Sequence, residues 1–121
     1  MLNLRRLLLP LILAASMPAC TEDPPAQGHA QAASVESAEA RRLVAAGAVL
    51  LDVRTPGEFQ GGHPSPARNI PVDELEARMS ELPRDKTVVV YCLSGGRSRQ
   101  AASMLARAGY TVRDLGRVSA W

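Results

Sequence analysis

The segment that decides the fold is TVVVYCLSGGRS, residues 87–98. Its first half is a run of β-branched and aromatic residues, typical of a strand buried on both faces of a parallel sheet. Its second half contains Gly95 and Gly96 and leads into a helical pattern over residues 99–108. Cys92 is therefore expected in a loop between a parallel strand and a helix, where open α/β sheets bind their ligands.

The surroundings of Cys92 favour a nucleophile. Gly95 and Gly96 let the loop curl so that several backbone N–H groups point inward and can bind an anion. The unpaired N–H groups of the helix start and the charge of Arg97 favour thiolate over thiol. A buried structural cysteine is the alternative, but such a residue does not need two glycines and an arginine in the next five positions. We therefore predict that Cys92 is the nucleophile.

The remainder of the chain alternates between helical and strand patterns. Helices are predicted over 37–46, 72–82 and 99–108, and strands over 49–53, 87–91 and 110–115. Pro56 marks a short turn into a helix, residues 61–71 are predicted as a loop, and Gly116 is expected to turn the chain after the last strand. This alternation indicates an α/β fold, a parallel sheet with helices on both faces. The core is expected to include Phe59, Tyr110 and Trp121.

The N-terminal residues 1–19 resemble an export signal. Arg5 and Arg6 precede an apolar run over 7–19 that is too short to span a bilayer. Cys20 resembles the lipidated cysteine of bacterial lipoproteins, because small residues precede it. We predict a lipoprotein-type signal peptide over 1–19, with ordinary cleavage nearby as the alternative. The mature protein is then exported and periplasmic, attached to a membrane only through a lipid at Cys20.

Residues 20–33 are polar, contain two prolines and are predicted to be a flexible tether before one folded domain over 34–121. The chain has 14 Lys and Arg against 12 Asp and Glu, and removal of Arg5 and Arg6 leaves 12 of each. Nucleic-acid binding needs a clustered basic surface, and the sequence shows no such cluster, so nucleic acid is not an expected partner. If Cys20 carries a lipid, Cys92 is the one remaining thiol. A Cys20–Cys92 disulfide is the competing interpretation, and it would block the cysteine loop.

Four segments resemble the single-domain rhodaneses, the thiosulfate sulfurtransferase family. They are DVRTPGEF at 52–59, GH at 62–63 with NIP at 69–71, the cysteine loop at 92–98, and GY at 109–110 with LG at 115–116 and Trp121. The similarity extends over about residues 35–121, and the exported single-domain form is similar to the periplasmic phage-shock-type rhodaneses. The resemblance implies the rhodanese-like three-layer fold and sulfur transfer.

Four residues separate Cys92 from Arg97, one fewer than in the related dual-specificity phosphatases. The shorter loop is suited to a sulfur atom on the thiolate rather than to a phosphate or arsenate. A Cys-dependent phosphatase or arsenate reductase is therefore the less expected activity. A non-catalytic rhodanese-like module that binds a partner is the other alternative, and the intact loop counts against it.

The resemblance implies that Cys92 accepts a sulfane sulfur from a small anionic donor such as thiosulfate and forms a persulfide. Cyanide or a thiol acceptor then takes the sulfur, and no metal or organic cofactor is expected. The backbone N–H groups of the loop are expected to stabilise the persulfide, from residues Leu93, Ser94, Gly95, Gly96, Arg97 and Ser98.

Asp52, Arg54 and Glu58 are expected to support the loop. Arg97 either attracts the donor or pairs with Asp52 or Glu58. The pairing is favoured, because a buried aspartate at a strand end needs a partner. Arg54 is expected at the mouth of the pocket, and for Arg68 the mouth and a solvated surface are equally expected.

Two further polar residues are assigned supporting roles. Ser98 is expected to cap the helix, with a hydrogen bond to the persulfide as a second role. His63 is expected to pack and fix its loop rather than to act as a general base, because a thiolate of low pKa needs no base.

Overall fold

The computed structural model describes residues 32–121, so the predicted signal peptide, Cys20 and most of the predicted tether lie outside the described residues. Five strands form one sheet in the order β1-β5-β4-β2-β3, and every neighbouring pair is parallel. The strands are β1 (Ala33–Ser34), β2 (Val49–Asp52), β3 (Arg68–Asn69), β4 (Val88–Cys92) and β5 (Val112–Arg117).

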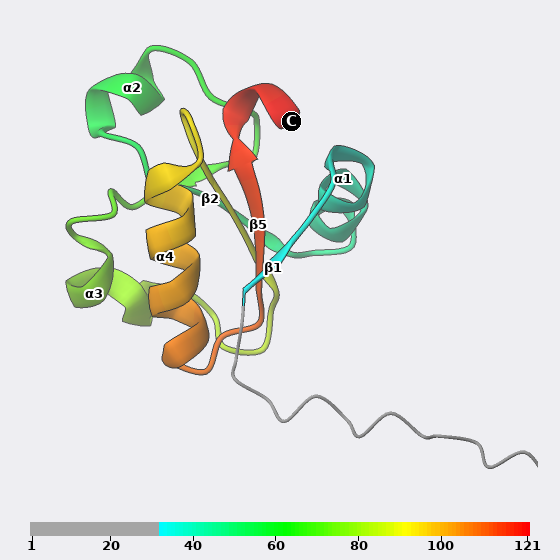
Figure 1. Cartoon of the computed structure of the whole chain (residues 1–121), viewed down its shortest axis with the longest axis vertical. Helices are drawn as coiled ribbons and strands as arrows, with labels where there is room; N and C mark the ends of the chain where they lie inside the picture. Colours follow the sequence, from blue (N-terminus) through cyan, green and yellow to red (C-terminus); the bar gives the residue numbers. More distant parts are fainter. Residues whose placement is uncertain (1–31) are drawn as a thin grey trace, which may run out of the picture.

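Helices cover both faces of this sheet. The α-helices are α1 (Ser37–Ala45), α2 (Pro56–Gln60), α3 (Leu75–Arg78) and α4 (Gly96–Arg107), and the 3₁₀ turns are η1 (Met79–Glu81) and η2 (Val118–Ala120). Helix α1 lies on one side of the sheet, and α3 and α4 lie on the other (Figure 1). The predicted α/β fold is confirmed. Within residues 32–121, no helix is both long enough and apolar enough to cross a membrane.

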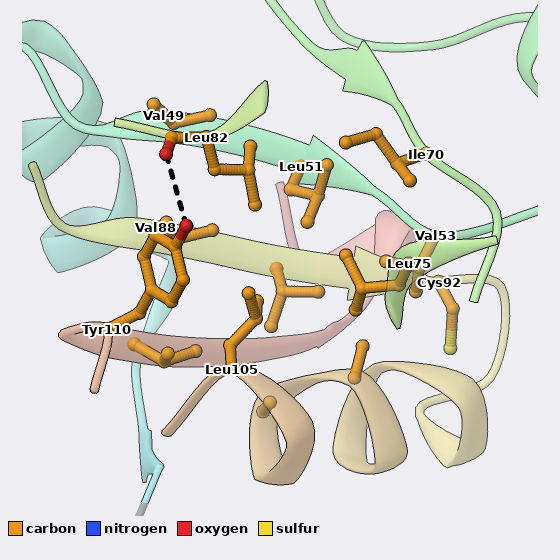
Figure 2. Close-up of a cluster of buried hydrophobic side chains, with 14 residues drawn as sticks. Val49, Leu51, Val53, Ile70, Leu75, Leu82, Val88, Cys92, Leu105 and Tyr110 are labelled. Atoms are coloured by element: carbon orange, nitrogen blue, oxygen red, sulfur yellow. Dashed lines mark hydrogen bonds between the residues drawn. The ribbon is translucent and has the colours of Figure 1, made fainter. Parts of the chain in front are cut away.

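Strand β4 is the centre of the protein because all five of its residues are buried. Its side chains alternate between two cores. Val88, Val90 and Cys92 belong to the cluster beneath α4, which Figure 2 shows with Leu105 from that helix. Val89 and Tyr91 belong to the cluster on the α1 side. A strand buried on both faces explains why the sequence 88–92 shows no polar alternation.

Several predicted boundaries are wrong. The predicted helix over 72–82 is reduced to α3 and η1. The Tyr110 hydroxyl donates to the carbonyls of Met79 and Leu82, at 2.8 and 3.2 Å, where the chain leaves η1. Helix α4 begins at Gly96 rather than at residue 99. The predicted loop over 61–71 contains β3, and Gly116 lies inside β5 rather than after it.

The N-terminal boundary also differs. Ala33, which was placed in the tether, pairs with Arg113 as part of β1. The backbone N–H of Val35 continues this contact by donating to the Asp114 carbonyl at 3.0 Å. The strand is two residues long and depends on β5 as its partner, so its own sequence gives no pattern from which to predict it.

Candidate active site

Cys92 is the last residue of β4, and its side chain points toward the first turn of α4 (Figure 2). The Sγ atom accepts a hydrogen bond from the backbone N–H of Gly95 at 3.0 Å. Gly95 has φ 104°, a left-handed conformation that glycine adopts without strain, and no side chain caps the helix. The loop therefore turns its backbone N–H groups toward the sulfur, as the two glycines predict.

These N–H groups decide the acidity of the thiol. Burial raises the pKa of Cys92, but hydrogen bonds outweigh it and the net pKa lies below the ordinary value of 9.0. The donors are the backbone N–H groups of Ser98, Gly95 and Ser94. The backbone of the loop thus shifts Cys92 toward the thiolate form.

The rate at which iodoacetamide alkylates Cys92 should follow a titration whose midpoint lies below 9.0, because only the thiolate reacts. The rate is measured against pH in the Cys20→Ser variant, in which Cys92 is the single thiol of the chain. The same chain in denaturant is the control, since unfolding removes the loop and should return the midpoint to the ordinary value. A folded-state midpoint equal to the denatured one would contradict the assignment.

Asp52 ends β2, the strand beside β4, and its carboxylate is fully buried. It accepts hydrogen bonds from the backbone N–H of Arg54 at 2.9 Å, from Arg54 Nη2 at 2.7 Å and from the Tyr91 hydroxyl at 2.7 Å. Burial, followed by the Asp52 hydrogen bond, raises the pKa of Tyr91, so the phenol keeps its proton and donates it. The partner of the buried aspartate is therefore Arg54, and the expected pairing of Asp52 with Arg97 is wrong.

Arg54 is not at the pocket mouth, so that expectation is wrong. The residue is only 6% exposed, because its guanidinium turns inward to Asp52. Its Nη2 also donates to the carbonyl of Gly62 at 2.8 Å. Arg54 thus ties the segment after α2 to the carboxyl end of the sheet. The hydrogen bond that Arg54 donates to the Asp52 carboxylate is the main cause that raises the pKa of Arg54.

Arg97 pairs with Glu58 in a two-pronged ion pair, with Nη1 to Oε1 at 2.7 Å and Nη2 to Oε2 at 3.1 Å. The hydrogen bond from Arg97 is the main reason that the pKa of Glu58 falls to about 2. Glu58 also completes a capping box with Thr55 at the start of α2. The pair fastens α2 to the first turn of α4, and of the two carboxylates considered for Arg97 it is Glu58 that pairs with it.

The structure changes the expectation for Ser98. Its hydroxyl lies 3.0 Å from the Gly95 carbonyl and 3.2 Å from the Gly116 carbonyl, so it donates to the backbone rather than capping the helix. Gly95 is the N-cap residue. Ser98 is fully buried and joins the cysteine loop to β5.

The remaining predicted loop residues form the rim. Leu93 is 55% exposed, the one large hydrophobic residue of the described chain on the surface, and Ser94 and Gly96 are exposed beside it. Arg68 is exposed on β3 and lines a cleft with Pro66 and Lys86, apart from Cys92. It occupies the surface position that was one of its two expected places.

The aromatic residues divide between core and surface. His63 stacks on Phe59 with ring centroids 3.5 Å apart, and its Nδ1 lies 2.7 Å from the Phe59 carbonyl, which fits the expected loop-fixing role. Phe59 is half-buried and belongs to neither core cluster, so its core assignment is wrong. Tyr110 is buried as expected, and Trp121 is partly buried against the α1-side cluster.

Two residues near the site were not predicted. Tyr91 holds Asp52, and Arg117 lies opposite Cys92 on β5. Strand alternation could have placed Tyr91 on the α1 side, but the position of Arg117 depends on a shift in strand pairing that the sequence does not show. Among residues 32–121, no group of three or more His, Cys, Asp or Glu side chains is placed to hold a metal ion.

With this geometry in place, comparison with known proteins decides the family. The model of the rhodanese-like domain matches residues 36–121. The chain belongs to the rhodanese-like family. The matched range contains the cysteine loop and both Asp52 and Glu58.

Rhodanese relatives agree in sequence and in structure. A protein named sulfurtransferase from Allochromatium vinosum is 44% identical over 75 residues, 60% of this chain and 70% of that protein. The thiosulfate sulfurtransferase PspE of Escherichia coli is 43% identical over 63 residues, 50% of this chain and 61% of that protein. The chain spans only 51% of a Bacillus subtilis relative that is 48% identical over 64 residues.

A solved structure supports the same fold. The rhodanese-related protein of Thermoplasma volcanium superposes with a TM-score of 0.65 at 32% identity, over 71% of this chain and 84% of that one. The match of the family model and this structural likeness agree on the rhodanese-like fold.

Proposed function

We propose that this rhodanese takes the outer sulfur of thiosulfate, or of a similar sulfane donor, onto Cys92 and passes it to cyanide or to a thiol. The observation that carries the proposal is the position of Sγ, which accepts the Gly95 N–H at 3.0 Å in a loop of donors that lowers the thiol pKa. A thiolate nucleophile is what attack on a sulfane sulfur requires.

The first step is a displacement at sulfur. The Cys92 thiolate attacks the outer sulfur of thiosulfate and forms a new S–S bond. The S–S bond of thiosulfate breaks, and its electron pair leaves with sulfite. The terminal sulfur of the resulting persulfide is anionic, and the backbone N–H groups of residues 93–98 stabilise it as an oxyanion hole stabilises oxygen.

The second step returns the enzyme to its first state. Cyanide attacks the terminal sulfur and leaves as thiocyanate, and the electron pair of the broken S–S bond returns to Cys92 as a thiolate. A thiol acceptor reacts in the same way and leaves as a persulfide. The cyanide cycle consumes no proton and no electron. The backbone N–H groups of the loop supply the stabilisation of the anionic sulfur.

The test is mass spectrometry of the Cys20→Ser chain after treatment with thiosulfate. The expected result is a gain of one sulfur atom at Cys92, which cyanide then removes with release of thiocyanate. The same chain alkylated at Cys92 beforehand is the control and should gain nothing. A chain that gains no sulfur would overturn the proposal, and hydrolysis of a chromogenic phosphate ester in its place would favour phosphatase chemistry.

A further inference from the structure

Strand β5 brings an arginine to the side of the nucleophile. The pairing of β4 with β5 shifts by one residue between Val90 and Tyr91, so Leu115 has no partner of its own. The carboxylate of Asp114 accepts the backbone N–H of Gly116 at 2.9 Å and holds this irregular turn. After the shift, Cys92 lies directly opposite Arg117. Without it, glycine rather than arginine would occupy that position.

The same shift decides which face of the sheet Arg117 occupies. Residues paired on neighbouring parallel strands point to the same face of the sheet, so Arg117 shares the α4 face with its partner Cys92. The next residue, Val118, packs into the cluster on the α1 side, as alternation from Arg117 requires. The Ser98 hydroxyl, 3.2 Å from the Gly116 carbonyl, confirms that this part of β5 adjoins the cysteine loop.

In the described part of the chain the charge of Arg117 is unpaired, unlike that of Arg54 and Arg97, the two arginines that support the cysteine loop. Arg54 is paired with Asp52, and Arg97 is paired with Glu58. Within residues 32–121, the exposed side chain of Arg117 forms no ion pair or hydrogen bond. Within each of the two ion pairs the positive and the negative charge cancel. Arg117 has no such partner among these residues, so it adds one positive charge to the rim beside Cys92.

We propose that Arg117 draws the anionic sulfur donor to Cys92 and selects donors by their charge. This inference rests on the proposed function, since it assigns the donor-binding residue of the same site. The backbone N–H groups of the loop hold the transferred sulfur, whereas Arg117 attracts the sulfonate end of thiosulfate that departs as sulfite. A dianionic donor should gain more from it than a monoanionic one.

The first test compares sulfur loading of Cys92 in the full-length Cys20→Ser chain with and without Arg117→Gln. In water, removing one positive charge that lies about 8 Å from a bound dianion lowers the second-order loading rate about five- to sixfold. We expect the second-order rate with thiosulfate to fall by about that factor at low salt, and the difference to shrink toward unity at 1 M salt. Arg117→Lys should recover most of the rate.

Arg107→Gln is the matched control, because it removes the same charge from the exposed last turn of α4, about 15 Å along the helix from Arg97. Its loading rate should stay within about twofold of the parent. Equal rates in the Arg117→Gln and Arg107→Gln chains, in a parent that does load sulfur, would overturn the inference and leave the proposed function intact.

The second test needs no sulfur chemistry. Iodoacetate is anionic and iodoacetamide is neutral, and both alkylate the Cys92 thiolate. The ratio of their rates should fall about twofold in Arg117→Gln and stay unchanged in Arg107→Gln. An unchanged ratio in Arg117→Gln would overturn the inference. The two proposals can also fail separately. If Arg117→Gln lowers the ratio but the parent gains no sulfur from thiosulfate, the proposed donor is wrong and the anion-attracting role of Arg117 holds.

Discussion

Replacement of Cys92 by serine should abolish thiocyanate formation from thiosulfate and cyanide, lowering kcat/KM by at least about a thousandfold. The serine oxygen can occupy the position of Sγ near the Gly95 N–H, so the loop should keep its shape. A hydroxyl is not ionised near neutral pH, however, and it cannot form a persulfide. Thiocyanate is measured by its coloured iron complex, with the Cys20→Ser chain as parent.

The control for this loss is Ser94→Ala. Ser94 is an exposed loop residue that contributes its backbone N–H to the sulfur, so removing its hydroxyl should change kcat/KM by less than about threefold. Circular dichroism and denaturant midpoints show whether both variants remain folded. If the folded Cys92→Ser chain kept a tenth of the parent activity, Cys92 would not be the sulfur carrier.

Replacement of Asp52 by alanine should lower the free energy of unfolding by about 3–5 kcal/mol. The substitution leaves the guanidinium of Arg54 buried without its carboxylate, and it also removes the acceptor of the Tyr91 hydroxyl. Stranding a buried charge costs more than losing the pair as a whole. Urea unfolding followed by circular dichroism measures the difference.

Two further variants separate the charge from the hydrogen bonds. Asp52→Leu combined with Arg54→Met removes both charges and should be more stable than Asp52→Ala alone. Tyr91→Phe removes one hydrogen bond to Asp52 and should cost about 1 kcal/mol. A loss of less than 1 kcal/mol in Asp52→Ala would show that water replaces the carboxylate and that the site is less dry than its burial indicates.

The sequence predicted most reliably those features that depend on local pattern. The apolar run before Cys92 and the glycines after it specify a strand, a left-handed turn and a helix start within one segment, and the structure has all three. The supporting residues were harder to place. Arg54 was expected at the mouth of the pocket, whereas its burial follows from the fully buried carboxylate two residues earlier, with which it pairs.

The features that were missed depend on contacts between distant segments. The strands β1 and β3 are each two residues long and exist because β5 and β2 pair with them. Arg117 lies opposite Cys92 because the pairing with β4 shifts by one residue. Such features carry no periodic pattern within their own sequence, so only the assembled sheet reveals them.

A nucleophile cradled by main chain has a consequence for how such a protein diversifies. The donors to Cys92 are mostly amide groups that every residue except proline possesses. Side chains at the exposed positions 93, 94 and 96 can therefore change without dismantling the sulfur-handling apparatus, provided that the left-handed turn at Gly95 is kept. Substitutions at the rim can therefore change which acceptor binds while the backbone N–H groups around Cys92 stay the same.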